Sequence, residues 1–367
     1  MRLTIPQPQF LKNLQMVEHA VNDRSTLPIL ANVLLETREG ELTLTATDLD
    51  VGIRCRFPLA TPIEQGAVAL PARKLTTIIR ELPEDTVTLE AKKNHTALLN
   101  CGTSAFRIPG LPAEDFPILP NMEEGERVTL PQGALKALVA QTAHAMSMEE
   151  TRFILNGALL TVQKNTLVMV ATDGRRLAIA SAPMTTQTKQ PLQAVIPAKT
   201  VRELGRLLQD EDLEDVAITP LKDNQLSFQF GHVTVITRLI EGQFPQYDKV
   251  VPAPTKSAFL CNRQTLTNAI RRTSLMTTAT SQAVVFELAP NRLVVSKESS
   301  ELGSAREELE VQYAGSPFTV AFNPEYWLDV LKNLEVEEVG IEVSGPDRPA
   351  VIRQPNFTYI VLPMKVA

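Results

Sequence analysis

Two stretches of this chain, NVLLETREGELTLTATDLDVGI (32–53) and NGALLTVQKNTLVMVATDGRRLAI (156–179), share one layout. In each, two runs of alternating apolar and polar residues flank a short polar turn, REG or QKN, and this pattern predicts a β-hairpin. Both second runs contain Ala-Thr-Asp near their end. A third stretch, AVVFELAPNRLVVSKES (283–299), keeps the hairpin pattern with the turn APN and lacks Ala-Thr-Asp. The chain therefore contains a repeated unit.

A second repeated pattern is a strand followed by Pro or Asn and then by a helix. It occurs in VALPARKLTTIIRELPED (68–85), AVIPAKTVRELGRLLQDED (194–212) and VAFNPEYWLDVLKNLEVEE (320–338). Pro71, Pro197 and Asn323 are separated by equal steps of 126 residues (197 − 71 and 323 − 197). A constant period over the whole chain indicates three copies of one unit.

A short amphipathic helix is predicted at the start of each copy, at 6–21, 131–146 and 262–276. Spacings of three and four place the apolar residues on one face of each helix. These residues are Phe10, Leu11, Leu14, Val17, Leu135, Leu138, Val139, Leu266, Ile270 and Leu275. Strands outnumber helices, so we predict three repeated α+β domains with antiparallel sheets and helices packed on one face. Polar or Pro-rich joints predict domains at 1–125, 126–252 and 253–367.

Composition limits the possible classes of protein. The 367 residues carry a net charge of −6 and are 44% hydrophobic, which suits ordinary domain cores and argues against an all-round basic surface. The N-terminal segment lacks the apolar core of a signal peptide, and no apolar run reaches the roughly 18 residues of a membrane span. Three widely spaced cysteines suggest neither a disulfide framework nor a metal site. We therefore expect a cytoplasmic protein with no membrane association.

Motifs of enzymes are absent from the sequence: it has no GxxxxGK[ST], GxGxxG, GxSxG or HExxH. Asp48 and Asp173 are the best catalytic candidates. Their occurrence in two copies without a repeated partner favours a structural role, in which each carboxylate accepts backbone N–H groups in an Asx turn. The alternative is an enzyme that uses Asp173, Arg175 and Arg176 on an anionic substrate.

Two further features point to binding. Basic residues fall on the helices that follow Pro71 and Pro197 and on the third amphipathic helix, where they could meet phosphates without reading a base sequence, or could form an ordinary solvated face. They are Arg73, Lys74, Arg80, Lys199, Arg202, Arg206, Arg271 and Arg272. The C-terminal segment TYIVLPMKVA (358–367) extends apolar residues beyond a predicted final strand at Tyr359–Val361, which suggests an adaptable peptide-binding surface.

With its three repeats and their motifs, the chain resembles the bacterial DNA polymerase III beta subunits, the sliding clamps, from end to end. The motifs that carry the resemblance are TLPIL (26–30), RFILNG (152–157), ATDGRRLA (171–178), FPQY (244–247), FNPEYWLDVL (322–331) and LPMK (362–365). The resemblance implies a DNA-clamp fold of three domains, with two chains closed head to tail into a ring. Helices would line the hole and sheets the outside. Such a ring would encircle duplex DNA, tether the polymerase and confer processivity, without catalysis, cofactor or metal.

The resemblance also implies three sets of site residues. A pocket for short linear peptides of the polymerase, the clamp loader and repair proteins would use Leu155, Thr172, Gly174, Arg175, Arg176, Leu177, Pro245, Val250, Asn323, Tyr326, Ile360, Val361, Leu362, Pro363 and Met364. DNA contacts would come from Arg24, Arg73, Lys74, Phe153 and Lys199. The dimer interface would include Phe106, Ile108 and Leu275.

Several positions depart from the family pattern. Arg175 stands where His is common, and Lys249 where Arg is usual. At the DNA face, Glu149 replaces Gln, and Phe153-Ile154 replaces a Tyr pair, so a repulsive carboxylate is added and two hydroxyl donors are lost. The segment at 297–311 is less acidic than its family counterpart. These departures keep a second hypothesis open, in which the chain is a clamp-like adaptor that binds peptides without encircling DNA.

Overall fold

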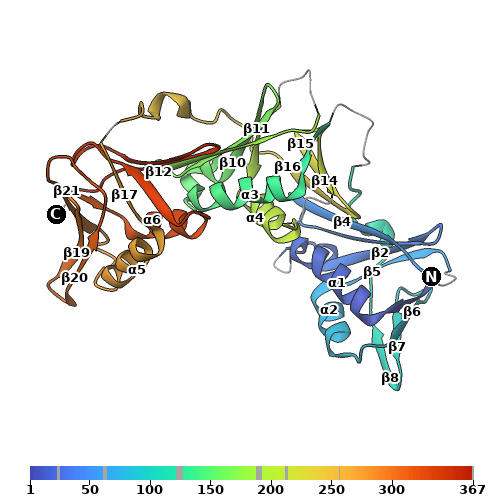
Figure 1. The fold of residues 1–367 in the computed structure, drawn as a ribbon. Coiled ribbons are helices and arrows are strands. Elements are labelled where there is room, and N and C mark those ends of the chain that lie inside the picture. Colours follow the sequence, from blue (N-terminus) through green and yellow to red (C-terminus); the bar gives the residue numbers. More distant parts are fainter. Residues whose placement is uncertain are drawn as a thin grey trace. The chain divides into compact units, whose positions relative to one another are not determined.

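The computed structural model describes residues 1–22, 25–60, 64–120, 127–186, 192–210, 214–255 and 257–365. They form two compact units, one made of Met1–Gly133, Thr185–Gln190 and Arg206–Leu239, the other of Ala134–Met184, Pro191–Gly205 and Ile240–Ala367. The three sequence repeats are thus distributed over two units, because the central repeat contributes strands to both. Each unit holds one eight-stranded and one four-stranded antiparallel sheet with helices packed against them (Figure 1).

The first unit is built on an eight-stranded sheet in the order β5-β2-β3-β4-β16-β15-β14-β9. These strands span Gly66–Pro71, Asn32–Arg38, Glu41–Thr47, Val51–Pro58, Val233–Arg238, Gln225–Phe230, Asp215–Leu221 and Val128–Pro131. Its four-stranded sheet has the order β1-β6-β7-β8, with bounds Arg2–Pro6, Thr86–Ala91, Ala97–Cys101 and Ser104–Ile108. Strand β4 of the first repeat pairs with β16 of the second, so one sheet continues across the two repeats.

The second unit repeats this plan with the order β13-β10-β11-β12-β24-β23-β22-β17. The strands span Gln193–Pro197, Gly157–Gln163, Thr166–Thr172, Arg176–Pro183, Phe357–Val361, Ala350–Gln354, Glu338–Glu342 and Ala258–Asn262. Its four-stranded sheet has the order β20-β19-β18-β21, with bounds Gly303–Glu310, Arg292–Ser299, Val284–Ala289 and Phe318–Phe322. Strand β12 of the second repeat pairs with β24 of the third.

The six α-helices among the described residues occur where the repeats predict them. They are α1 (Gln7–Val17), α2 (Ala72–Glu81), α3 (Gln132–Thr142), α4 (Ala198–Leu207), α5 (Arg263–Ser274) and α6 (Pro324–Lys332). Helices α1 and α2 pack together, as do α5 and α6 (Figure 1). The structure also contains short 3₁₀ helices, η1 (Glu18–Ala20), η2 (Pro28–Ala31), η3 (Ala113–Asp115), η4 (Ala143–Ala145), η5 (Glu150–Leu155) and η6 (Tyr247–Val250).

Sequence patterning explains these elements. Phe10, Leu14, Leu138 and Ile270 are at most 1% exposed, as the helical stripes predict. The hairpin turns contain residues with left-handed backbone, Glu39, Lys164 and Asn291, with φ of 53°, 57° and 58°, which match the right-handed twist of the flanking strands.

One stripe residue is wrongly predicted. Leu275 is 70% exposed, because α5 ends at Ser274 and Leu275 is only its C-cap. Most of its side chain therefore lies at the surface and not in the core.

The three cysteines are buried thiols in the described part of the chain. Cys55, Cys101 and Cys261 are free and buried, and burial raises the pKa of Cys55 and Cys261 to about 12. Among the described residues, no group of three or more His, Cys, Asp or Glu side chains could hold a metal ion. Within those same ranges, every helix is too short or too polar to span a membrane.

Candidate functional site

The Ala-Thr-Asp turn has the same hydrogen bonds in both of its copies. Asp48 Oδ1 accepts the backbone N–H groups of Asp50 (3.1 Å) and Val51 (2.8 Å). In the second copy, Asp173 Oδ1 accepts those of Arg175 (2.8 Å) and Arg176 (3.0 Å). The preceding threonine hydroxyl in each copy donates to the carbonyl four residues later and accepts an N–H two residues later. The predicted Asx turn is confirmed.

The second copy of this turn opens onto a cavity of about 260 Å³ in the second unit. The cavity is lined by Leu155, Thr172, Gly174, Arg175, Arg176, Leu177, Pro245, Gln246, Tyr247, Val250, Ile360 and Leu362. Leu155, Leu177, Ile360 and Tyr247 are buried and form part of its apolar lining. Val250 and Leu362 remain 64% and 45% exposed, so a ligand could cover them.

Ten of the fifteen residues predicted for the pocket line this cavity together, although they come from distant segments. Strand β24 explains how the C-terminal segment reaches it, because Leu177 pairs with Ile360, and the Leu362 N–H donates to the Arg175 carbonyl at 2.9 Å. The sequence did not predict Gln246 and Tyr247, although both belong to the FPQY motif. Tyr247 packs in the same core cluster as Leu177 and Ile360, and burial raises the pKa of its hydroxyl.

The other five predicted pocket residues do not line the cavity. Val361 is buried in β24, and Pro363 follows Leu362. The Met364 N–H donates to Ala321 on β21 at 2.7 Å. Asn323 caps α6 by accepting the Glu325 N–H. Tyr326 lies under the guanidinium of Arg176, whose Cζ is 4.4 Å from the ring centroid.

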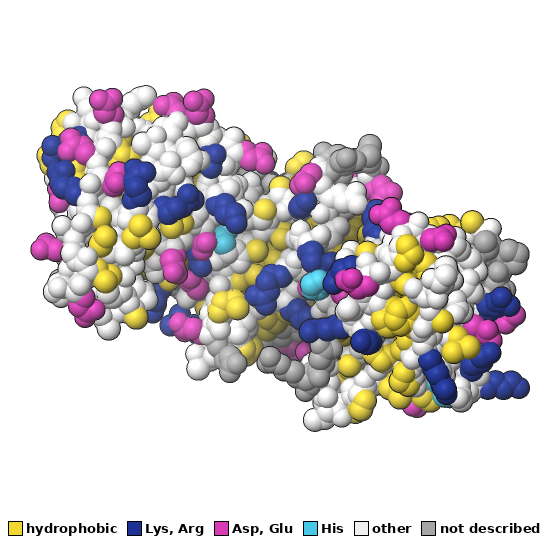
Figure 2. All heavy atoms as spheres, turned by 90° about the horizontal axis from the view of Figure 1, so that it is seen from below, with side chains coloured by type: hydrophobic (Ala, Val, Ile, Leu, Met, Phe, Trp, Pro, Cys, Tyr) yellow, Lys and Arg dark blue, Asp and Glu magenta, His cyan; other side chains and the backbone are white. Residues whose placement is uncertain are grey.

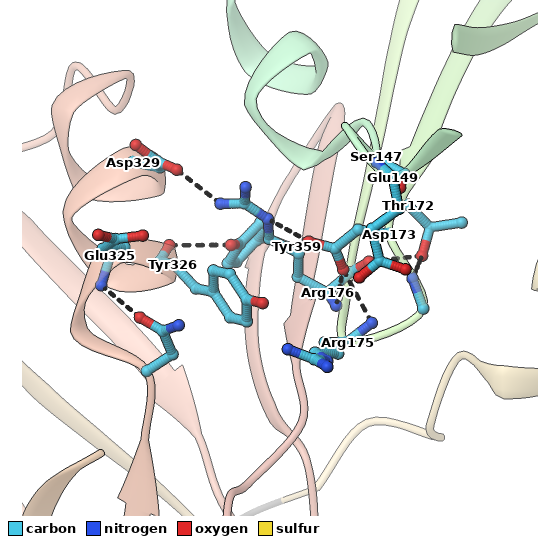
Figure 3. A network of polar contacts seen from close by, with 12 residues as sticks. Ser147, Glu149, Thr172, Asp173, Arg175, Arg176, Glu325, Tyr326, Asp329 and Tyr359 are labelled. Atoms are coloured by element: carbon cyan, nitrogen blue, oxygen red, sulfur yellow. Dashed lines mark hydrogen bonds and ion pairs between the residues drawn. The ribbon is translucent and has the colours of Figure 1, made fainter. Parts of the chain in front are cut away.

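Arg176 joins the turn to helix α6 (Figure 3). Its Nε lies 3.0 Å from Asp173 Oδ2 and its Nη1 lies 2.6 Å from Asp329 Oδ2. The Tyr359 hydroxyl donates to the Tyr326 carbonyl at 2.8 Å. Both oxygens of Asp173 therefore have partners, which argues against the alternative in which this carboxylate is a free catalytic base.

His144 packs beside this network. Its ring lies 5.5 Å from that of Tyr359, and neither ring nitrogen has a hydrogen-bond partner among the described residues. Burial, followed by the nearby positive charge of Arg176, lowers the pKa of His144 to about 4. The imidazole is therefore neutral at pH 7 and acts as a packing residue.

The predicted DNA-binding residues belong to both units. Arg73 and Lys74 are exposed on α2 in the first unit, whereas Phe153, 61% exposed on η5, and the partly exposed Lys199 on α4 belong to the second. Arg24 lies outside the described residues. Each unit carries Lys and Arg side chains on the face seen in Figure 2, mixed with acidic and apolar side chains.

Some of the predicted cations have structural partners. Arg206 donates to the carbonyls of Gln15 and Met16 at 3.0 Å, and Arg272 pairs with Glu307 at 2.6 Å. Glu149, predicted to repel phosphates, lies 3.4 Å from Arg152, which partly offsets its charge. Of the predicted interface residues, Phe106 (38%) and Leu275 (70%) are exposed, whereas Ile108 is 3% exposed and mainly packs inside its unit.

The chain matches known proteins over its full length. Residues 1–120, 129–246 and 248–365 match the N-terminal, central and C-terminal domains of the DNA polymerase III beta subunit family. The chain is 34% identical to the beta sliding clamp of Pseudomonas putida and 31% identical to that of Vibrio cholerae, covering all of each chain. It superposes on the crystal structure of the Pseudomonas aeruginosa sliding clamp bound to griselimycin with a TM-score of 0.94, 33% identity and complete coverage of both chains. This three-domain, full-length match places the chain in the DNA polymerase III beta subunit family, the beta sliding clamps.

Proposed function

We propose that this chain is a DNA sliding clamp, which encircles duplex DNA and tethers the replicative polymerase, so that synthesis becomes processive. The observation that carries this proposal is the collinear match of all three domains to the beta subunit family. Members of this family are processivity factors and not enzymes. Because a replicative clamp would work on chromosomal DNA, the proposal includes a cytoplasmic location. We also propose that the three domains of the clamp span residues 1–125, 126–252 and 253–367.

The cavity beside the second Ala-Thr-Asp turn supports a binding site for partner peptides. It combines a buried apolar lining with exposed apolar residues at its mouth and a few polar groups, which suits the capture of Leu and aromatic side chains. Through it, the polymerase, the clamp loader and repair proteins would each present a short linear segment. Tyr326, which packs against Arg176 of the cavity lining, would extend the contact, as would Asn323 and the residues after Leu362.

Edge strands support a head-to-tail dimer. Adjacent repeats are joined by β4–β16 and β12–β24, whereas β8 of the first repeat and β20 of the third are outer strands of their sheets. A second chain would continue the series by pairing its β8 with β20 of the first, and two such contacts would close a ring. Phe106 lies on β8, and α5, which ends before Leu275, is tied to β20 through Arg272 and Glu307.

DNA contacts in such a ring need only be loose. Exposed Arg73 and Lys74 on α2 can meet phosphates of any sequence, and weak electrostatic contact permits sliding. The topology of a closed ring, and not the affinity of these contacts, would keep the clamp on DNA.

The decisive experiment is loading of the chain by its clamp loader onto a nicked circular duplex, followed by linearisation of the DNA. A sliding ring should remain on the circle and be lost from the linear form. Retention that does not depend on the topology of the DNA would contradict the clamp proposal. It would favour the adaptor, which binds peptides at the cavity without encircling DNA.

A further inference from the structure

Two guanidinium groups line the cavity, and they differ in what they contact. Arg176 is 11% exposed at its side chain and is held by Asp173, by Asp329 and by the ring of Tyr326. Its charge is already matched by two carboxylates inside the fold. Arg176 can therefore offer a ligand little beyond its aliphatic surface, and its role is to position the turn against α6.

Arg175 is the other guanidinium, and it is exposed. Among the residues that the structure describes, it forms no salt bridge. A side-chain hydrogen bond with Tyr326, together with the nearby charges of Glu149 and Asp173, raises the pKa of Arg175, so that the guanidinium stays charged. Figure 3 shows Arg175 near Tyr326 and below the Arg176–Asp329 pair.

The carboxylates closest to Arg175 are engaged elsewhere. Asp173 accepts two backbone N–H groups through Oδ1 and pairs with Arg176 through Oδ2. Glu149 pairs with Arg152. Most of the five N–H donors of Arg175 thus remain available to a ligand in the cavity, and a planar guanidinium matches the geometry of a carboxylate.

We propose that Arg175 is a specificity-determining residue of the peptide pocket and that it favours partner peptides with an aspartate or glutamate next to their apolar anchor. The anchor would enter the cavity between Leu177, Val250 and Leu362, and the adjacent carboxylate would accept hydrogen bonds from Arg175 at the mouth. This inference rests on the peptide-binding role proposed above and names the chemistry of its partners.

The expected effect is modest, because the pair would remain partly in water. Exposed ion pairs contribute about 0.2–1 kcal/mol, which corresponds to a preference of up to roughly fivefold. The preference should also shrink as salt screens the charges.

The experiment measures binding by the fluorescence anisotropy of labelled decapeptides that each contain one Leu and one Phe as anchors. At each of the other positions in turn, a peptide with Asp is compared with the same peptide with Asn. The full-length chain should bind the Asp form up to fivefold tighter than the Asn form at one or more positions near the anchors. Arg175→Gln should bring this ratio close to one, whereas Arg175→Lys should retain part of it. The wild-type ratio should fall in 0.5 M NaCl.

The matched control is Lys249→Gln. Lys249 is an exposed cation that precedes Val250 and does not line the cavity. The Lys249→Gln variant should keep the wild-type ratio of Asp-peptide to Asn-peptide affinity. An equal loss of this ratio in both variants would mean that the preference comes from overall positive charge and not from Arg175, which would overturn the inference. A wild-type ratio of one at every position would also overturn it while leaving the pocket intact. If no peptide binds the wild-type chain, the peptide-binding role itself fails, and the inference fails with it.

Discussion

At the scale of single residues, Arg176 and Asp173 show how one turn joins distant parts of the chain. Thr172 and Asp173 hold the turn through local hydrogen bonds that their residue types predict. The partner of Arg176 on α6, Asp329, lies 153 residues later. No local pattern contains that pairing, because it depends on β24 lying beside β12. The sequence therefore predicted the turn from its residues and the pocket only through family resemblance.

Asp173→Asn tests the two functions of this carboxylate separately. Asn keeps an Oδ1 acceptor for the turn and loses the charge that pairs with Arg176. We expect a decrease of about 1–2 kcal/mol in the free energy of unfolding, measured by urea denaturation. Asp173→Ala loses the turn hydrogen bonds as well and should cost about 1 kcal/mol more. Equal effects of the two substitutions would mean that the turn hydrogen bonds contribute nothing measurable.

His144 should make the second unit sensitive to acid. Its pKa is about 4 in the folded chain, below the ordinary value of 6.5 that it takes on unfolding. As the pH falls, His144 is therefore protonated in the unfolded state before it is protonated in the folded state. Its contribution to the free energy of unfolding, which is present at pH 7, is lost as the pH falls from about 6.5 towards 4. Linkage gives a loss of roughly 2 kcal/mol between pH 7 and pH 5 from this residue.

The measurement is urea unfolding of wild type and His144→Phe at both pH values. Phe fills a similar space beside Tyr359 and cannot titrate. Between pH 7 and pH 5, the free energy of unfolding of the variant should fall by about 2 kcal/mol less than that of wild type, whatever the stability of the variant at pH 7. Parallel losses in the two proteins would exclude His144 as the source.

At the scale of elements, the repeats were predictable because the period of 126 residues places each strand–helix joint in register. The joints at Pro71, Pro197 and Asn323 each end a strand or precede a helix as expected. The strand pairings between repeats were not predictable. Alternation shows which face of β4 or β12 is buried, but it does not identify the strand that pairs with its edge.

Gly157 on β10 tests how closely two elements approach. A Cβ at this position would lie 2.2 Å from the backbone oxygen of Ile196 on β13. Because backbone cannot move aside as a side chain can, Gly157→Ala should lower the free energy of unfolding by about 3 kcal/mol. Gly340 on β22 is the control, since its nearest neighbour would be 4.0 Å away.

Gly340→Ala should be near neutral, or stabilising by about 0.5 kcal/mol. Thermal unfolding of both variants would check the pair. A small effect at Gly157 would show that β10 and β13 can separate without loss of the fold.

At the scale of the whole molecule, Leu275 is the sharpest test of the proposed ring. It is 70% exposed although it is a large apolar residue. A ring closed by two identical interfaces would bury it twice, so Leu275→Asp should weaken closure by about 4 kcal/mol, or roughly a thousandfold. Light scattering should show a mass of twice 40.4 kDa for wild type and 40.4 kDa for the variant.

Ile118→Asp is the matched control. Ile118 is 96% exposed and lies outside the proposed interface, so its replacement should leave the mass of a dimer. A wild-type chain that is monomeric at micromolar concentration would contradict the dimer, and dissociation by both variants would mean that the effect is not specific to Leu275.

The β4–β16 and β12–β24 pairings also determine how the chain can be divided. Each eight-stranded sheet combines strands from two consecutive repeats, so a cut between two repeats would split such a sheet through its middle. A repeat excised and expressed alone would carry a bare strand edge that invites aggregation. We therefore expect that the three repeats cannot serve as interchangeable modules, although their sequences make them look like separable parts.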